Sequence, residues 1–209
     1  MSRPLWLALL VLAPVLSSCR IVSTQELADL KNPPNPHMAN IDRAWLQNIV
    51  PQIVNEARPA GELLSLISAA GDFDSACKQY GWRAQDENPC VFAVRVSGTV
   101  EKVDTASRSG KVFIKDSRGE TVAVQLGPTL RGTALRDGYK GVSYQDFNDQ
   151  VLFGNYSRAI NEQAAAMMKA FNPQPGDTVT VDGVFSAWDI PTSVPDVTPA
   201  KITRTQGGA

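Results

Sequence analysis

The first nineteen residues constrain this chain more than any other stretch. Leu5 to Leu16 form an apolar run of 12 residues, and the positive charge of Arg3 precedes it. A membrane-spanning helix needs about 20 apolar residues, so this run has the length of a secretory signal peptide instead. It ends in Leu16-Ser17-Ser18-Cys19, the pattern that a bacterial lipoprotein peptidase cleaves after a diacylglycerol has been attached to the thiol.

This pattern predicts a lipoprotein signal peptide over residues 1–18 and a lipid-modified Cys19 at the start of the mature chain. Acyl chains such as those of diacylglycerol and palmitate anchor a protein durably, because each buried CH₂ contributes about 0.8 kcal/mol. We therefore expect a protein tethered to the periplasmic face of a bacterial envelope membrane. Arg20 and not an aspartate follows the cysteine, which favours the outer membrane. The alternative is an ordinary signal peptide followed by an unmodified cysteine.

The charge of the chain is nearly balanced, with 20 lysines and arginines against 21 aspartates and glutamates. An exported chain of this charge has no bulk attraction for nucleic acid, so we expect no nucleic-acid partner. His37 lies among prolines and is expected to be solvated, and no spacing of Cys, His or Asp indicates a metal site. The sequence holds no catalytic or cofactor motif, so we expect neither an enzyme nor a bound cofactor.

Cys77 and Cys90 are the cysteines that remain once Cys19 carries lipid. In an oxidising compartment they permit one pairing. A disulfide between them would close a loop of 14 residues and stabilise the fold by roughly 3 kcal/mol in the chain-entropy model. The alternative is two buried free thiols.

Residues 19–39 are interpreted as a tether, because they hold three prolines and show little periodicity. Residues 40–90 are predicted to form a small helical subdomain, with later helices over residues 60–70 and 72–79. Pro51 must kink or break the first helix, because proline lacks the N–H and clashes with the preceding turn. That first helix is indicated by apolar residues at four-residue steps: Ile41, Trp45, Ile49 and Ile53.

The pattern changes to a period of two in residues 91–205, which is typical of strands. The first stretch, residues 91–105, slips in phase between Glu101 and Val103, which indicates a β-bulge or bend. Residues 127–141 are expected to be a loop, followed by helices that begin at Ser143 and at Asn155. The later strands are expected over residues 111–116, 120–126, 177–188 and 197–204, the last of them a short edge strand at best.

Three strands, a helical crossing and two further strands follow one another in the order of an OB-type barrel. We therefore predict an α+β fold, in which the small N-terminal helical subdomain precedes a five-stranded OB-like β-barrel over residues 91–205. The helical insertion lies between strands three and four. A plain α+β sandwich would show the same order of elements and is the alternative.

Four blocks resemble the signature of one family: Val103–Gly110, Val124–Pro128, Arg131–Asp137 and Phe147–Gln150. With the N-terminal lipoprotein pattern, they resemble domain-of-unknown-function family 2291, which is described as predicted periplasmic lipoproteins. The resemblance implies a helical part joined to an OB-like barrel. It also implies an envelope role beside sugar ABC-transport components, because the genes of members often lie near such transporter genes. It implies no established activity.

The Gly-rich loop Arg131–Asp137, beside the turn Asp104–Arg108, is the candidate ligand-binding site. Two arginines in such a loop can hold a carboxylate, a phosphate or sugar hydroxyls by forked hydrogen bonds, and small barrels often bind through their loops. In the structural alternative, an arginine pairs with Asp104 or Asp137 and pins the loop over the barrel end. The candidate residues are Asp104, Arg108, Arg131, Arg136 and Asp137.

These observations favour a non-catalytic binding or accessory module of the periplasm. One alternative is an envelope scaffold that docks a partner protein through Trp45 and Trp82, although tryptophans are more often core residues. A less favoured alternative is a hydrolase of envelope glycans that uses paired carboxylates. The candidate pairs are Asp146 with Asp149 and Glu101 with Asp104, and nothing in their spacing favours catalysis over solvated faces.

Overall fold

A long, bent strand organises the sheet of this protein. In the computed structural model, β2 spans Cys90–Asp104 and pairs with β3 (Ser109–Lys115) and β5 (Thr178–Ala187). Its register against β3 shifts between Val100 and Lys102, which confirms the β-bulge that the phase slip predicted. Because a bulge bends its strand, β2 serves both halves of the curled sheet.

The structure describes residues 23–24 and 35–205. The predicted signal peptide, the lipid site at Cys19 and most of the predicted tether lie outside these residues. From Pro36 onward the described residues form one compact unit, which begins four residues before residue 40, the predicted start of the helical subdomain. The boundaries predicted between tether, helical subdomain and barrel stay predictions.

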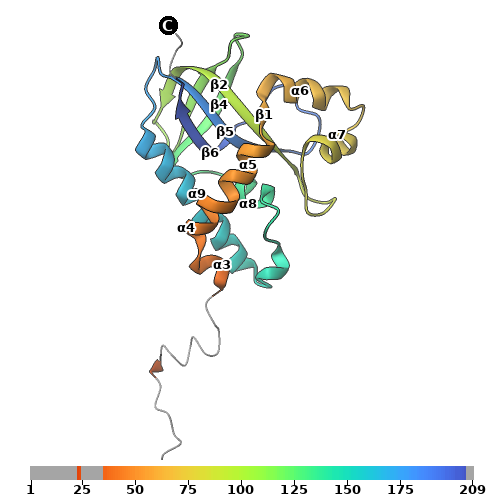
Figure 1. Ribbon diagram of the computed structural model, residues 1–209, viewed down its shortest axis with the longest axis vertical. Coiled ribbons are helices and arrows are strands. Elements are labelled where there is room, and N and C mark those ends of the chain that lie inside the picture. The colour runs from red at the N-terminus through yellow and green to blue at the C-terminus, as the bar shows by residue number, and fades with distance from the viewer. Residues whose placement is uncertain (1–22, 25–34, 206–209) are drawn as a thin grey trace, which may run out of the picture. The chain divides into compact units, whose positions relative to one another are not determined.

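The strands follow the order β4-β3-β2-β5-β6, with β4 at Thr121–Pro128 and β6 at Thr198–Arg204. Val124 lies in β4, at one end of this order, and Val197 directly precedes β6, at the other end. The sheet curls so far that these two residues form a parallel bridge. This curled antiparallel sheet, with helices between β4 and β5, confirms the predicted OB-like fold (Figure 1). β6 lies at the end of this order, as the predicted edge strand would, and six of its seven residues pair with β5.

Three helical elements cross from β4 to β5. They are α8 (Ala134–Gly138), the 3₁₀ helix η3 (Tyr144–Asp146) and α9 (Gln150–Phe171). The prediction that residues 127–141 form only a loop is wrong, because α8 buries Leu135 completely. A five-residue helix is too short to show a period in the sequence.

The N-terminal helical path runs through α3 (Pro36–Ala39), α4 (Ile41–Ala44), the π-helix η2 (Trp45–Ile49) and α5 (Val50–Glu56). Of the two outcomes predicted at Pro51, a kink or a break, the break is wrong, because η2 continues directly into α5. Pro51 lies in the first turn of α5, where a missing N–H is tolerated. The N–H of Val50 reaches back to the carbonyl of Trp45, so a π-helical turn takes the place of a break.

The next two helices are α6 (Ala60–Ala69) and α7 (Phe73–Tyr80). Before α6, the two residues Arg58–Pro59 form β1 and pair in parallel with β2. Asp72 caps α7, because its carboxylate accepts the N–H of Ser75. Both helices lie at one side of the sheet, whereas α3, α4, α8 and α9 gather at its lower end in Figure 1.

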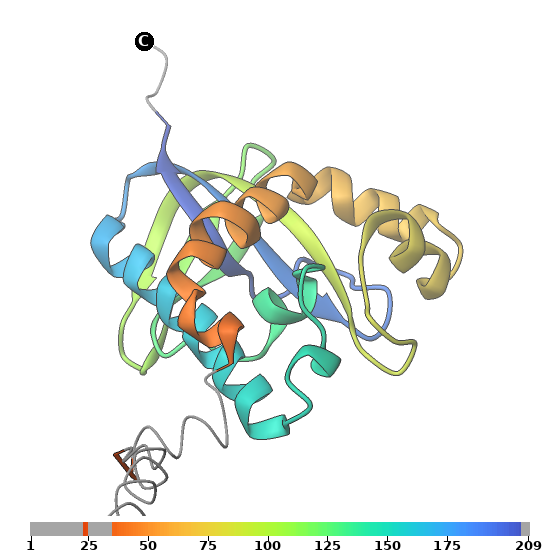
Figure 2. The ribbon, with the colours of Figure 1, turned by 60° about the horizontal axis from the view of Figure 1, so that its bottom comes forward.

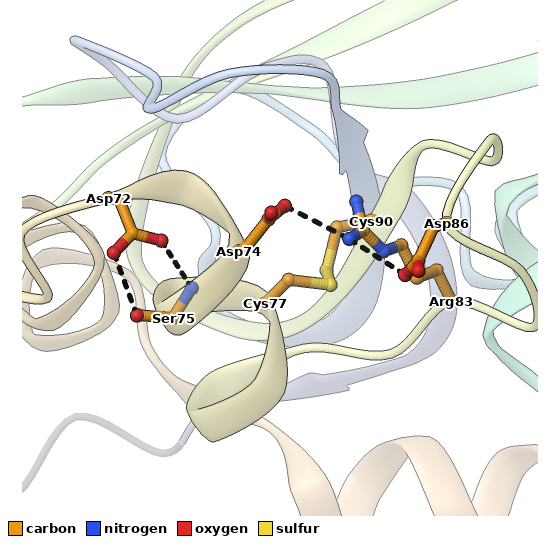
Figure 3. The surroundings of a disulfide bond; sticks show 7 residues. All are labelled: Asp72, Asp74, Ser75, Cys77, Arg83, Asp86 and Cys90. Atoms are coloured by element: carbon orange, nitrogen blue, oxygen red, sulfur yellow. Dashed lines mark hydrogen bonds and ion pairs between the residues drawn. A yellow bond between two sulfur atoms is a disulfide. The ribbon is translucent and has the colours of Figure 1, made fainter.

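A disulfide joins Cys77 of α7 to Cys90 at the start of β2, as predicted. Both cysteines are buried in the barrel core. Figure 3 shows Arg83 reaching from the intervening loop to Asp74 and Asp86, each at 3.0 Å. The segment between the cysteines is therefore held by one covalent bond and two ion pairs.

Two apolar clusters form the core. The first fills the barrel and includes Leu63 and Ile67 of α6 and Ala76 of α7. The second lies between the helices and the outer face of β2 and β5, where Trp45, Leu135 and Tyr156 pack together. Helices of the N-terminal part thus share both clusters with the strands.

Candidate functional site

The predicted ligand loop is part of a segment that we call the arginine loop, Leu130–Gly138. The Arg136 guanidinium donates to the carboxylate of Asp137 at 2.6 and 2.8 Å and lies 3.9 Å from the ring centre of Phe153. Its side chain is only 14% exposed. The hydroxyl of Thr133 also donates to Asp137. One arginine–carboxylate pair of the structural alternative, Arg136 with Asp137, is therefore present.

The other end of the arginine loop is held by Gln125 of β4. The backbone N–H of Arg131 donates to the Gln125 side-chain oxygen at 2.6 Å, and the Gln125 amide donates to the carbonyl of Arg131 and the hydroxyl of Thr198. The Arg131 guanidinium donates to the hydroxyl of Ser109 at 2.8 Å. Because Gln125 is buried, these bonds fix the loop to the sheet.

The turn Asp104–Arg108 lies beside this loop, as the sequence predicted, since the N–H of Thr129 donates to the carbonyl of Arg108 at 2.9 Å. The carboxylate of Asp104 accepts from Lys102 and from the N–H of Ala106 and not from an arginine of the loop. The predicted ligand role of these residues stays a prediction. Their hydrogen bonds hold two loops together.

A groove that the sequence did not predict lies on the other side of β4. It has a volume of about 730 Å³ and runs between the second half of α9 and the ends of β2 and β4. We call it the α9 groove. Its wall is mostly apolar: Val103, Leu126, Gly127, Pro128, Ala165, Ala166, Met168 and Pro173, with Thr105, Glu162, Lys169, Asn172 and Gln174 as polar members.

Small residues let α9 approach β4 at the base of this groove. Gly127 has a φ of +97°, and a Cβ on it would lie 3.3 Å from the Cβ of Ala165. Neighbouring residues of a strand point to opposite faces, so Leu126 lines the groove while Gln125 binds the arginine loop. β4 therefore supports both regions at once.

Two charged side chains of α9 border the groove. Glu162 and Lys169 are seven residues apart, which places them on one face of the helix about two turns from each other. Among the described residues, neither has an ion-pair partner within 4 Å. The groove thus joins an apolar wall to one free ammonium group and one free carboxylate.

The carboxylates considered for catalysis serve as hydrogen-bond acceptors. The N–H of Ser143 holds the pKa of Asp146 below its usual range, and the hydroxyl of Thr121 does the same for the pKa of Glu101. The N–H of Ala106 lowers the pKa of Asp104. A general acid needs a raised pKa, and the pKa values of these three carboxyl groups are lowered.

The remaining sequence candidates fall in different places. Trp45 is buried in the second cluster, whereas Trp82 is 38% exposed and lies beneath the ammonium of Lys140. His37 is half-buried against Phe147 and not simply solvated.

In residues 23–24 and 35–205, no three His, Cys, Asp or Glu side chains are grouped as metal ligands. None of the helices in this part of the chain is long and apolar enough to span a membrane.

Comparison with solved structures gives the fold alone. An OB-fold protein from Thermotoga maritima is similar with a TM-score of 0.60 and 13% identity, over 78% of this chain and 95% of that one. An OBody bound to hen egg-white lysozyme has a TM-score of 0.29 and 16% identity, over 63% of this chain and 85% of its own. No curated protein matches the chain.

The family is shown by a match along most of the sequence. The family model described as "Predicted periplasmic lipoprotein" matches residues 9–203. This range contains most of the apolar N-terminal run, Cys19, the arginine loop and the whole α9 groove. It supports a periplasmic, lipid-anchored location and agrees with the resemblance that the sequence blocks carried. The chain belongs to domain-of-unknown-function family 2291, the predicted periplasmic lipoproteins.

Proposed function

We propose that this lipoprotein is a non-catalytic binding module of the periplasm and that the α9 groove holds its ligand. The groove itself carries the proposal. Its volume of about 730 Å³ lies within the range of small-molecule sites, roughly 300–1,000 Å³. Such sites are mostly apolar and have a few polar groups that orient the ligand, which is the composition of this wall.

The chemistry of the wall favours a small amphipathic ligand with an anionic end. Leu126, Met168 and Pro173 offer contacts to an apolar body. The ammonium of Lys169, free of any ion pair with a described residue, is placed to bind a carboxylate or phosphate at the rim. Glu162 at the other end of the groove would repel a second anionic group.

A binding role is preferred to a catalytic one because of what the carboxylates do. Asp104 and Asp146 accept hydrogen bonds from backbone N–H groups, and the hydroxyl of Thr121 donates to Glu101. Neither Asp104 nor Asp146 lines the α9 groove. The proposal therefore assigns these groups to loop and helix structure.

The proposal has two finer parts that rest on the sequence. Arg20 after the lipid-modified cysteine favours the outer membrane, and the family resemblance implies work beside sugar ABC-transport components. The largely apolar wall of the α9 groove favours an amphipathic molecule over a free sugar as its occupant. Docking of a partner protein at the half-exposed Trp82 is the alternative function.

A thermal-shift series tests the groove. We expect sodium decanoate or octyl phosphate to raise the melting temperature, because a ligand that binds only the folded state stabilises it, and we expect glucose and maltose not to. Ala166→Trp fills the groove and should remove the shift. Ala170→Trp is the matched control, because Ala170 is exposed one turn further along α9 and does not line the groove.

The outcomes separate the possibilities. A shift that survives Ala166→Trp as fully as Ala170→Trp would exclude the groove as the site. A shift with sugars that Ala166→Trp leaves intact would support the transport connection and place its site elsewhere. Lys169→Gln should weaken the binding of octyl phosphate more than the binding of a neutral analogue such as octanol.

A further inference from the structure

An exposed apolar corner lies where α9 begins. Val151 is 71% exposed, Tyr144 45% and Leu152 37%. We call these three residues the α9 corner. Singly exposed apolar residues are ordinary on a protein surface, whereas a group of them rimmed by polar residues marks a contact site.

The α9 corner rests on a firm base. The rings of Tyr144 and Phe147 lie 5.8 and 5.4 Å from the ring of Phe153. Asp149 caps α9 by accepting the N–H groups of Val151 and Leu152 at 2.7 and 2.9 Å. These contacts hold the backbone of the corner at the start of α9.

The chain enters the compact unit at this same corner. His37 of α3 lies 5.5 Å from Phe147 and 6.3 Å from Tyr156, measured between ring centres. Figure 1 shows α3 and the start of α9 together at the lower end of the unit, and Figure 2 brings that end forward. The chain thus enters the unit beside Phe147, whose ring packs on Phe153 next to Tyr144.

The position of the chain entry limits how far this corner can lie from a lipid on Cys19. Only 16 residues lie between Cys19 and Pro36. A chain of this length reaches at most roughly 60 Å when fully extended. A lipid on Cys19 therefore sets an upper limit on the distance between the entry corner and the bilayer.

We propose that the α9 corner contacts the bilayer surface, with Tyr144 among the head groups and Val151 and Leu152 at the boundary of the acyl chains. Tyrosine favours this depth, because its ring is apolar and its hydroxyl is polar. The proposal rests on the lipid anchor of the proposed function. It is independent of the ligand in the α9 groove.

Charge has little part in this contact. No lysine or arginine occurs between residues 141 and 157, and the carboxylates of Asp146 and Asp149 bond to N–H groups of their own turns. The contact therefore depends on apolar burial and not on attraction to anionic lipid. The exposed carboxylates of Asp146 and Asp149 keep their negative charge, so raising the salt should not weaken the contact, in contrast to a basic patch.

Quenching of tryptophan emission by brominated lipids tests the contact. The mature lipid-modified protein is reconstituted into vesicles of phosphatidylethanolamine and phosphatidylglycerol with brominated acyl chains. Tyr144→Trp reports on the corner. Ser68→Trp is the control, because Ser68 is exposed near the end of α6, and residues 41–56 of α4, η2 and α5 separate α6 from α3.

We expect Tyr144→Trp to lose more emission than both the parent protein and Ser68→Trp, and this excess should not fall as the salt is raised. Adding Val151→Asp and Leu152→Asp to the Tyr144→Trp variant should abolish this excess while the melting temperature stays close to that of Tyr144→Trp. Equal quenching at the two reporters, or none at either, would overturn the corner contact. Protein that fails to float with the vesicles would instead contradict the anchor itself.

Discussion

The arginine loop and the α9 groove share one strand and one helix, yet they use polar groups in opposite ways. In the loop, Arg136 bonds to Asp137 and Arg131 to Ser109. Along the groove, Lys169 and Glu162 have no ion-pair partner among the described residues. The loop is thus internally satisfied, whereas the groove has charge available to a ligand.

This difference shows that a stretch of sequence rich in charged residues need not be the binding site. Arg131–Asp137 stands out because of its charges and glycine, and its side chains hold the loop to β4 and α9. The groove is built from Gly127, Ala165 and similar common residues, which leave space because they are small. A motif that is rich in functional groups can therefore be structural, while the binding volume is made by residues with no motif at all.

The largest effect is expected from Arg136→Ala. It leaves the carboxylate of Asp137 half-buried without its ion pair and removes the contact with Phe153, so we expect a loss of about 2–3 kcal/mol in the free energy of unfolding. Urea denaturation measures it. Arg108→Ala is the control, because Arg108 is exposed, and should change stability by less than about 0.5 kcal/mol. Equal effects of the two would contradict a structural role for Arg136.

Gln125→Ala should have the next largest effect. It removes the acceptor of the Arg131 N–H and the donor to Thr198 within a buried region, and we expect a loss of about 2 kcal/mol. Arg131→Ala removes one exposed bond to Ser109 and should cost less than half of that. Calorimetry of both variants checks the order, and a larger loss in Arg131→Ala would reverse the assignment of the anchoring residue.

Tyr156 packs with the arginine loop in the second cluster. Its buried hydroxyl has no hydrogen-bond partner among the described residues, in contrast to the polar groups of that loop. Burial raises the pKa of Tyr156 to about 12, above its unfolded value of about 10. The protonated Tyr156 therefore contributes its full share to the free energy of unfolding below pH 10, and this share is lost as the pH rises from 10 to 12. At pH 11 the loss should be about 1.4 kcal/mol.

Tyr156→Phe tests this assignment in the same denaturation experiment. The variant should be at least as stable as the parent at pH 7, because it buries no unsatisfied hydroxyl. It should also lack the part of the alkaline loss between pH 10 and 11 that Tyr156 causes. An unchanged alkaline profile would show that another group titrates.

The sequence predicts much of the sheet, because strands that are buried on one face alternate visibly. Val94 and Val96 mark β2, and the phase slip near Lys102 marks its bulge. Helix starts are equally local, so the helices predicted to begin at Asp72 and Ser143 are confirmed. The prediction fails where structure depends on distant packing: α8 is too short for a period, and the π-helical turn before Pro51 has no signal of its own.

The candidate site divides in the same way. The turn at Arg108 and the loop at Arg131 were expected to meet, and they do. The α9 groove was missed because residues from Val103 to Gln174 line it together, and they come from three segments that only the barrel brings side by side. Its free ammonium, on Lys169, looks in the sequence like any exposed lysine of an amphipathic helix.

The most direct test of the account is a titration of the amphipathic anion 1-anilinonaphthalene-8-sulfonate against the folded protein and two variants. We predict that Ala166→Trp weakens binding by about tenfold or more, equivalent to about 1.4 kcal/mol, and that Arg131→Ala leaves the dissociation constant unchanged. Loss of binding in Arg131→Ala together with full binding in Ala166→Trp would show that the arginine loop and not the α9 groove is the binding site.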